Sequence, residues 1–262
     1  MTDLPLRLEF ASQPLPAIAV IHTADLVRAL RQGVDDFLER PSHVVFLCII
    51  YPIVGLVLAR LTVGQNLLPL LFPLAAGFTL VGPFAAIGLY ELSRRRELGL
   101  DGAYWRAFDV LKAPAIRSIG LLGAILCAIT LTWLYAAQLI AAATIGDAPA
   151  TFGDFARAVF TTPGGWAMIV IGNAVGFCFA ALVLTISVFA FPMLLDRNVD
   201  LVTAVRTSIH AVVVNPGVMV LWGLMVAGIL AMGSLPMLIG LAIALPILGH
   251  ATWHLYRKTV GV

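Results

Sequence analysis

Charged residues are scarce in this chain of 262 residues, and their scarcity excludes an ordinary soluble domain. Asp, Glu, Lys and Arg together make up 11% of the sequence, against about a quarter in soluble globular domains. Residues 207–256 contain none of the four. Apolar residues make up 61%, and the mean hydropathy is +1.00. Because roughly 20 apolar residues in a helix cross the hydrocarbon of a bilayer, the sequence predicts several membrane spans.

The strict alternation of apolar and polar residues that a membrane β-barrel needs is also missing. Open sheet edges cannot lie in lipid, because their backbone groups would stay unpaired. We therefore expect an all-α fold, a polytopic membrane helical bundle.

Motifs that carry chemistry are absent as well. The three cysteines, Cys48, Cys127 and Cys178, lie in separate apolar runs without metal-ligand spacing. The sequence has no GxSxG, P-loop, GxGxxG or HExxH motif. No Asp, Glu, Lys or Arg lies in the middle of an expected span, where such residues mark ion or proton pathways. We therefore expect no catalytic residues, no cofactor and no metal, and a protein that is not an enzyme.

Hydrophobic runs and prolines divide the chain into a flexible N-terminal tail, residues 1–23, and a single membrane domain, residues 24–262. Six transmembrane helices are expected at about 43–61, 67–91, 117–144, 166–194, 217–232 and 236–256. Three amphipathic helices are expected at about 24–40, 103–113 and 199–214. The charged residues 94–97 and the polar residues 146–164 are expected to be loops.

One block occurs twice, 175 residues apart. Asp25-Leu-Val-Arg-Ala-Leu-Arg leads to Pro41 and an apolar run, and Asp200-Leu-Val-Thr-Ala-Val-Arg leads to Pro216 and another. Residues 103–113 with Pro114 follow the same pattern without matching residue by residue. The sequence thus predicts three repeats of an amphipathic helix plus a helical hairpin. Asp25 and Asp200 are expected at helix N-termini, where free N–H groups favour a carboxylate.

Lysine and arginine are distributed unevenly between the two sides of the expected spans. Fourteen of the sixteen fall on the side that holds both termini, and only Arg60 and Arg157 fall on the other. Because basic residues stay on the cytoplasmic side, we expect both termini in the cytoplasm and the protein in a bacterial inner membrane. The three amphipathic helices would then meet the cytoplasmic leaflet.

Two small groups of residues are candidate sites. His250 and His254 share one face of the last span, where they could bind a haem or a metal; alternatively they are two interfacial histidines. Gly172, Asn173 and Gly176 form a small-xxx-small pattern that brings helices close together in membranes.

The run Phe191-Pro-Met-Leu-Leu-Asp-Arg197, continued by Ala204, Ser208 and Asn215-Pro216, resembles a bacterial family of integral membrane proteins catalogued as domain of unknown function 2189. The resemblance extends over nearly the whole chain beyond the tail. Some relatives carry a cytochrome c oxidase label. A catalytic oxidase subunit needs several membrane histidines for two haems and a copper, whereas this chain offers only His43, His210, His250 and His254 near spans. The resemblance therefore implies an accessory role.

We thus expect a non-catalytic inner-membrane protein, an accessory or assembly subunit of a respiratory complex such as cytochrome c oxidase. Its expected partners are the lipid bilayer and other membrane subunits, with no nucleic acid. The alternative is a transporter or carrier of small molecules or lipids with a site at the repeat interface. A third possibility is a haem-binding enzyme that uses His250 and His254.

Overall fold

The computed structural model of the protein describes residues 15–39, 53, 73, 86–101, 103–146, 151–235 and 239–260. Every regular element in these residues is helical, which confirms the expected all-α class. Pro41, the first expected span and most of the second lie outside the described residues. The six-span count and the threefold repeat therefore stay predictions.

Among the described residues, three stretches are long and apolar enough to cross a membrane. They coincide with the expected spans at 117–144, 166–194 and 217–232. The stretches are α7 (Ile116–Thr144), α9 (Pro163–Ser187) continued by α10 (Ala190–Asp196), and α12 (Pro216–Ser234).

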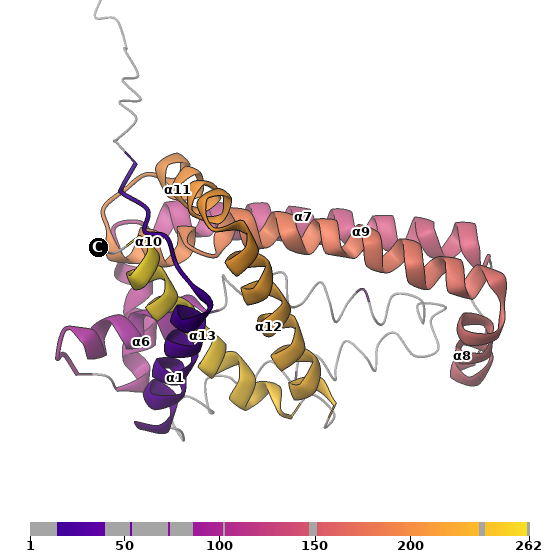
Figure 1. Cartoon of the computed structure of the whole chain (residues 1–262), viewed down its shortest axis with the longest axis horizontal. Coiled ribbons are helices and arrows are strands. Elements are labelled where there is room, and N and C mark those ends of the chain that lie inside the picture. The colour runs from indigo at the N-terminus through magenta and orange to yellow at the C-terminus, as the bar shows by residue number, and fades with distance from the viewer. Residues whose placement is uncertain are drawn as a thin grey trace, which may run out of the picture.

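Helices α7 and α9 run side by side and form the long arm of the molecule (Figure 1). Trp133 of α7 fixes their contact, because its buried indole lies 5.6 Å, between ring centroids, from Phe179 of α9. Gly176 leaves room for this ring: a Cβ at that position would lie 3.1 Å from the indole. At this point of the pair, an aromatic contact is combined with a small residue.

Helix α8 (Phe152–Thr161) lies at the far end of the arm (Figure 1), inside residues 146–164. The expectation of a loop there is wrong. The Thr151 hydroxyl accepts a hydrogen bond from the backbone N–H of Asp154 at 3.1 Å and donates one to its carboxylate at 2.7 Å. This cap satisfies the free N–H groups of the first turn and starts a helix.

The amphipathic segments gather at the opposite end, with α6 (Ile87–Glu97) and the C-terminal end of the last helix (Figure 1). They are α1 (Thr23–Glu39), η2 (Tyr104–Lys112) and α11 (Leu201–Val214). The second is a 3₁₀ helix instead of the α-helix that its pattern suggested.

Residues 94–97 are the last turn of α6 and not a loop, which corrects a second expectation. Three arginines there, Arg94, Arg95 and Arg96, lie at the negative end of the helix dipole and stabilise it. The helix ends before Gly99, whose φ of +66° is a left-handed conformation that favours glycine.

The segment expected to be the sixth span forms α13 (Leu241–Thr259), which is not among the three span candidates, and much of it is buried inside the protein. Helices α1, α6 and α12 pack against it. The contact with α1 is close at Gly33, where a Cβ would lie 2.6 Å from the Ile247 carbonyl oxygen and 2.7 Å from the Ala251 nitrogen. Only glycine lets the two backbones approach this far.

Residues 15–22, part of the segment expected to be a flexible tail, are instead held against the helices. The Ala19 N–H donates to the Thr259 carbonyl at 2.9 Å. Asn215, buried between α11 and α12, accepts from the Ile21 N–H at 2.9 Å and donates to the Ala19 carbonyl at 3.1 Å. The side chain of Ile21 is 2% exposed. This segment therefore ties the start of α1 to the C-terminal half of the chain.

Candidate functional site

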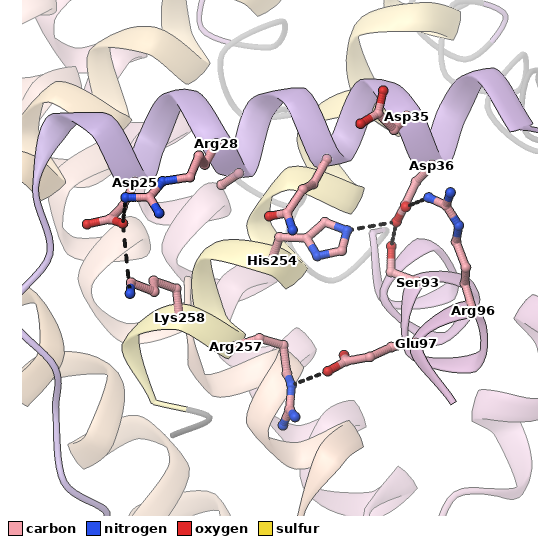
Figure 2. Close-up of a pocket in the computed structure, with 12 residues that line it drawn as sticks. Asp25, Arg28, Asp35, Asp36, Ser93, Arg96, Glu97, His254, Arg257 and Lys258 are labelled. Carbon is pink, nitrogen blue, oxygen red and sulfur yellow. Dashed lines mark hydrogen bonds and ion pairs between the residues drawn. The ribbon is translucent and has the colours of Figure 1, made fainter. Parts of the chain in front are cut away.

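A polar cleft opens between α1, α6 and α13, with a volume of about 590 Å³ (Figure 2). Its walls carry both signs of charge. The lining residues are Asp25, Arg28, Ala29, Gln32, Asp35 and Asp36 of α1, Ser93, Arg96 and Glu97 of α6, and His254, Arg257 and Lys258 of α13.

Asp36 is the centre of this cleft. Its side chain is 4% exposed, yet it receives donors from both neighbouring helices. Ser93 donates to its Oδ2 at 2.5 Å, His254 Nε2 lies 3.0 Å from the same oxygen, and the Arg96 guanidinium pairs with Oδ1. A buried carboxylate is tolerated only when it is paired in this way. Asp36 therefore joins three helices through one charge.

The charge state of Asp36 follows from these contacts. Burial by itself raises the pKa of the carboxyl, but hydrogen bonds from His254 and Ser93 outweigh burial and lower the pKa to about 2. Asp36 is thus an anion at neutral pH and can only accept hydrogen bonds.

The anion fixes the protonation of the next residue in the network. Ser93 has a single hydroxyl proton, which it donates to Asp36. At the 2.7 Å contact between Ser93 Oγ and His250 Nδ1, the imidazole must therefore be the donor. The lone pair of a neutral His250 then lies on Nε2, which is buried and has no hydrogen-bond partner in the described part of the chain. The network orients this ring through Ser93.

A second group of polar contacts links α13 to Glu97 of α6 and to Asp196 of α10. Arg257 Nε donates to Glu97 at 3.0 Å and its guanidinium pairs with Asp196 at 3.2 Å. Trp253 donates its indole N–H to Glu97 at 3.1 Å, and the Tyr256 hydroxyl donates to Asp196 at 2.8 Å. These bonds hold α13 against α6 and α10.

The repeat-related aspartates both lie at the start of a helix, but at different positions. Asp25 is the third residue of α1, and its carboxylate accepts from the His22 N–H at 2.9 Å. Asp200 is the N-cap of α11 and accepts from the Thr203 N–H at 2.8 Å. That hydrogen bond is the main reason why the pKa of Asp200 is lowered.

Asp25 has a further role at the cleft, where it is 7% exposed and pairs with Arg28 at 3.0 Å and Lys258 at 4.0 Å (Figure 2). Pro216, the other described residue of the repeat pattern, is the first residue of α12, where its fixed φ suits a helix start.

The structure separates the members of the small-residue pattern. Gly176 packs against Trp133, as described above. A Cβ on Gly172 would meet nothing within 4 Å among the described residues. Asn173 is exposed and donates to the carbonyl of Ile169 in its own helix at 2.7 Å. Only Gly176 takes part in a described helix contact.

His254 contacts the carboxylate of Asp36, and His250 contacts the hydroxyl of Ser93. These contacts do not amount to a metal or haem site formed by the two histidines together. Within the described residues, no group of three His, Cys, Asp or Glu side chains could hold a metal ion. His254 Nε2 already contacts Asp36, so a metal or haem there would have to displace that contact.

Asp36 and Ser93 are the residues of the site that the sequence analysis did not identify. The spacing of small and apolar residues in α1 nevertheless indicates that Asp36 is buried. Leu26, Ala29, Gly33 and Asp36 follow at intervals of three and four, and all are buried. Asp35 next to it is exposed.

Comparison with known proteins adds a family. The model of a family described as predicted integral membrane protein (DUF2189) matches residues 71–196. The match includes Phe191–Asp196 of the run quoted above and ends there, so the expectation of a resemblance over nearly the whole chain is corrected to this stretch. No curated protein and no solved structure matches the chain. Residues 71–196 are thus similar to the DUF2189 family, whose members are described as predicted integral membrane proteins.

Proposed function

We propose that the protein is a non-catalytic accessory or assembly subunit of a membrane respiratory complex, such as cytochrome c oxidase, and that it acts by packing its helices against partner subunits. The observation that supports the packing role is the exposed side of α12. The respiratory partner comes from the label carried by some relatives of the family.

Helix α12 presents a continuous exposed stripe. Its most apolar part is only 11% buried, and among its residues only Met219 and Trp222 are buried. Exposed residues recur at intervals of three and four along the helix: Gly217, Val220, Leu221, Leu224, Ala227, Gly228, Ala231 and Met232. Small residues such as Ala227, Gly228 and Ala231 let a second helix approach closely in a membrane, where packing and not hydrophobicity drives association.

The proposed location is a bacterial inner membrane with both termini in the cytoplasm. The distribution of charge in the fold supports it. The end of the molecule with α1, α6 and the last turn of α13 carries most of the described arginines and lysines, whereas α8 at the far end carries Arg157. Fusions of alkaline phosphatase test the orientation: a fusion within residues 146–150 should be active and a fusion after residue 260 inactive.

Purification from native membranes in mild detergent, followed by mass spectrometry, tests the function. We expect respiratory subunits in stoichiometric amounts with the wild-type protein. Gly228→Leu should lose them, while Gly172→Leu, where a Cβ would meet no described atom within 4 Å, should keep them. If the wild-type protein purifies alone, the proposal is wrong. A haem absorption band that remains with the protein after the partner subunits have been removed would contradict the non-catalytic role.

One observation favours a second function, a carrier of small molecules or lipids. The polar cleft lies where α1, from the first expected repeat, meets α13, from the third, and α13 contains Pro246 in its interior. Broken helices at a repeat interface frame the sites of many transporters. A compound that copurifies with the protein and is lost in Gln32→Trp, which would fill the cleft, would support this function. Absence of any such compound would count against it.

A further inference from the structure

The 3₁₀ helix η2 sorts its residues into three separate stripes. A 3₁₀ helix has three residues per turn, so residues three apart lie directly above one another. Trp105, Phe108 and Leu111 form one stripe, and their exposed fractions are 56%, 57% and 67%. In an α-helix the same residues would be displaced by about 60° at each step, and the stripe would be spread over a wider face.

The second stripe attaches η2 to the protein. Ala107 and Val110 are 7% and 8% exposed. Ala107 packs against α6 at Gly88, where a Cβ would lie 3.2 Å from the Cβ of Ala107. The position of η2 on α6 is therefore fixed, and its apolar stripe points away from the protein core.

The third stripe is charged. Asp109 pairs with Lys112 at 3.2 Å, with Arg106 at 3.4 Å and with Arg95 of α6 at 3.5 Å. The hydrogen bond from Lys112 lowers the pKa of Asp109 and keeps it ionised. The stripe thus carries two cations and one anion, and exposed Arg117 follows at the start of α7. This net positive flank suits anionic headgroups.

The chain places η2 close to where a span begins. Only residues 113–115 separate Lys112 from the first residue of α7, a reach of at most about 14 Å. Helix α7 is a membrane-span candidate, so η2 lies near the depth at which that span enters the bilayer. Tryptophan and phenylalanine are favoured at this depth, because their rings suit the boundary between headgroups and acyl chains.

We propose that Trp105, Phe108 and Leu111 insert into the boundary between headgroups and acyl chains of the leaflet that α7 enters, so that η2 is an anchor lying in the plane of the membrane surface. The charged stripe then faces the headgroups and water. The occupant of the apolar stripe is lipid, not a second protein. The 3₁₀ conformation matters, since it alone aligns all three side chains.

Nitroxide labels at six positions of η2 test the proposal in the full-length protein. Cys48, Cys127 and Cys178 are replaced by alanine, and single cysteines are introduced at positions 105, 106, 108, 109, 111 and 112. Each labelled protein is reconstituted in vesicles of phosphatidylcholine with phosphatidylglycerol, and the accessibility of the label to oxygen and to a water-soluble nickel complex is measured.

A label in lipid meets oxygen more than nickel, and a label in water meets both. We expect the oxygen-to-nickel ratio to be several-fold higher at 105, 108 and 111 than at 106, 109 and 112, which gives a period of three. A ratio typical of water at 105, 108 and 111 overturns the proposal. Low accessibility to both reagents there also overturns it, because it would mean that protein covers the stripe.

A second measurement uses no cysteine variant, so it still tests the proposal if the labelled cysteine variants misfold. The difference between the fluorescence of the wild-type protein and of Trp105→Phe isolates the emission of Trp105. Phosphatidylcholine brominated near the headgroup end of its acyl chains should quench this emission more strongly than lipid brominated near the chain ends. Equal absence of quenching by both lipids contradicts insertion.

Discussion

The Asp36 carboxylate of α1 and the His254 imidazole of α13 lie 3.0 Å apart, although 218 residues separate them in the sequence. Ser93 and Arg96 of α6 meet the same carboxylate. One side chain thus joins three helices through specific polar contacts, which help to fix the positions of the helices relative to one another.

Replacing Asp36 by asparagine should therefore destabilise the protein. The substitution keeps the shape of the side chain but removes the negative charge that accepts hydrogen bonds from Ser93 and His254. Arg96 is 43% exposed and keeps its ion pair with Glu39, so the expected loss is that of a hydrogen bond to a charged group, about 1.5–3 kcal/mol. The free energy of unfolding can be measured by titrating the detergent-solubilised protein with sodium dodecyl sulfate. Asp35→Asn, on the exposed neighbour, is the matched control and should change little. Equal effects of the two variants would contradict the role of Asp36.

The stabilisation by Asp36 should vanish only in strong acid. Because the pKa of Asp36 is lowered from 3.8 to about 2 in the folded protein, its contribution is complete above pH 3.8 and is lost as the pH falls through 2. The difference in unfolding free energy between wild type and Asp36→Asn should therefore stay large at pH 5 and shrink toward pH 2. A difference that has already disappeared at pH 5 would show that the carboxylate is not held by its donors.

The Gly33 contact predicts a pair of opposite results for two glycine substitutions. Gly33→Ala places a Cβ 2.6 Å from a backbone oxygen of α13, so the helices must separate, at a cost of about 1–3 kcal/mol. Gly172→Ala meets no described atom within 4 Å, and alanine is the better helix former by about 1 kcal/mol. Thermal unfolding in detergent should show a lower midpoint for the first variant and an equal or higher one for the second. If Gly33→Ala unfolds like wild type, the packing of α1 on α13 is looser than described.

Asn215 should control whether the N-terminal segment stays attached. Asn215→Leu preserves volume but leaves the Ile21 N–H and the Ala19 carbonyl without their partner, and each unsatisfied buried group costs about 1–3 kcal/mol. Hydrogen exchange followed by mass spectrometry should show faster exchange in residues 15–22. The control is Asn173→Leu, because that amide bonds only its own helix among the described contacts. Unchanged protection in Asn215→Leu would mean that the segment is held by other contacts.

The apolar runs were sufficient to predict α7, α9 and α12, because length and hydropathy decide which helices can cross a membrane. Helix starts are set by local chemistry that the sequence also displays, such as Asp200 at α11 and Pro216 at α12. The helix α8 was missed because the cap formed by Thr151 and Asp154 is a weaker signal than the glycines and prolines around it.

The polar centre could not be predicted in the same way. The spacing of α1 places Asp36 on the buried face of the helix, but it does not show which distant residues, Ser93 and His254, would meet the carboxylate. The geometry of η2 was also not predictable, since the apolar pattern of its nine residues is compatible with either helix type. Local pattern determined the elements, and long-range contacts determined which polar groups were enclosed.

The pairing of α1 with α13 has a consequence for biogenesis. A ribosome completes α1 first and reaches α13 about 200 residues later, which at ordinary synthesis rates takes roughly 10–40 s. During that interval Asp36 has no imidazole to meet. Helix α1 therefore stays without its main packing partner until α13 has been synthesised, and the buried charge of Asp36 can be enclosed only after that point.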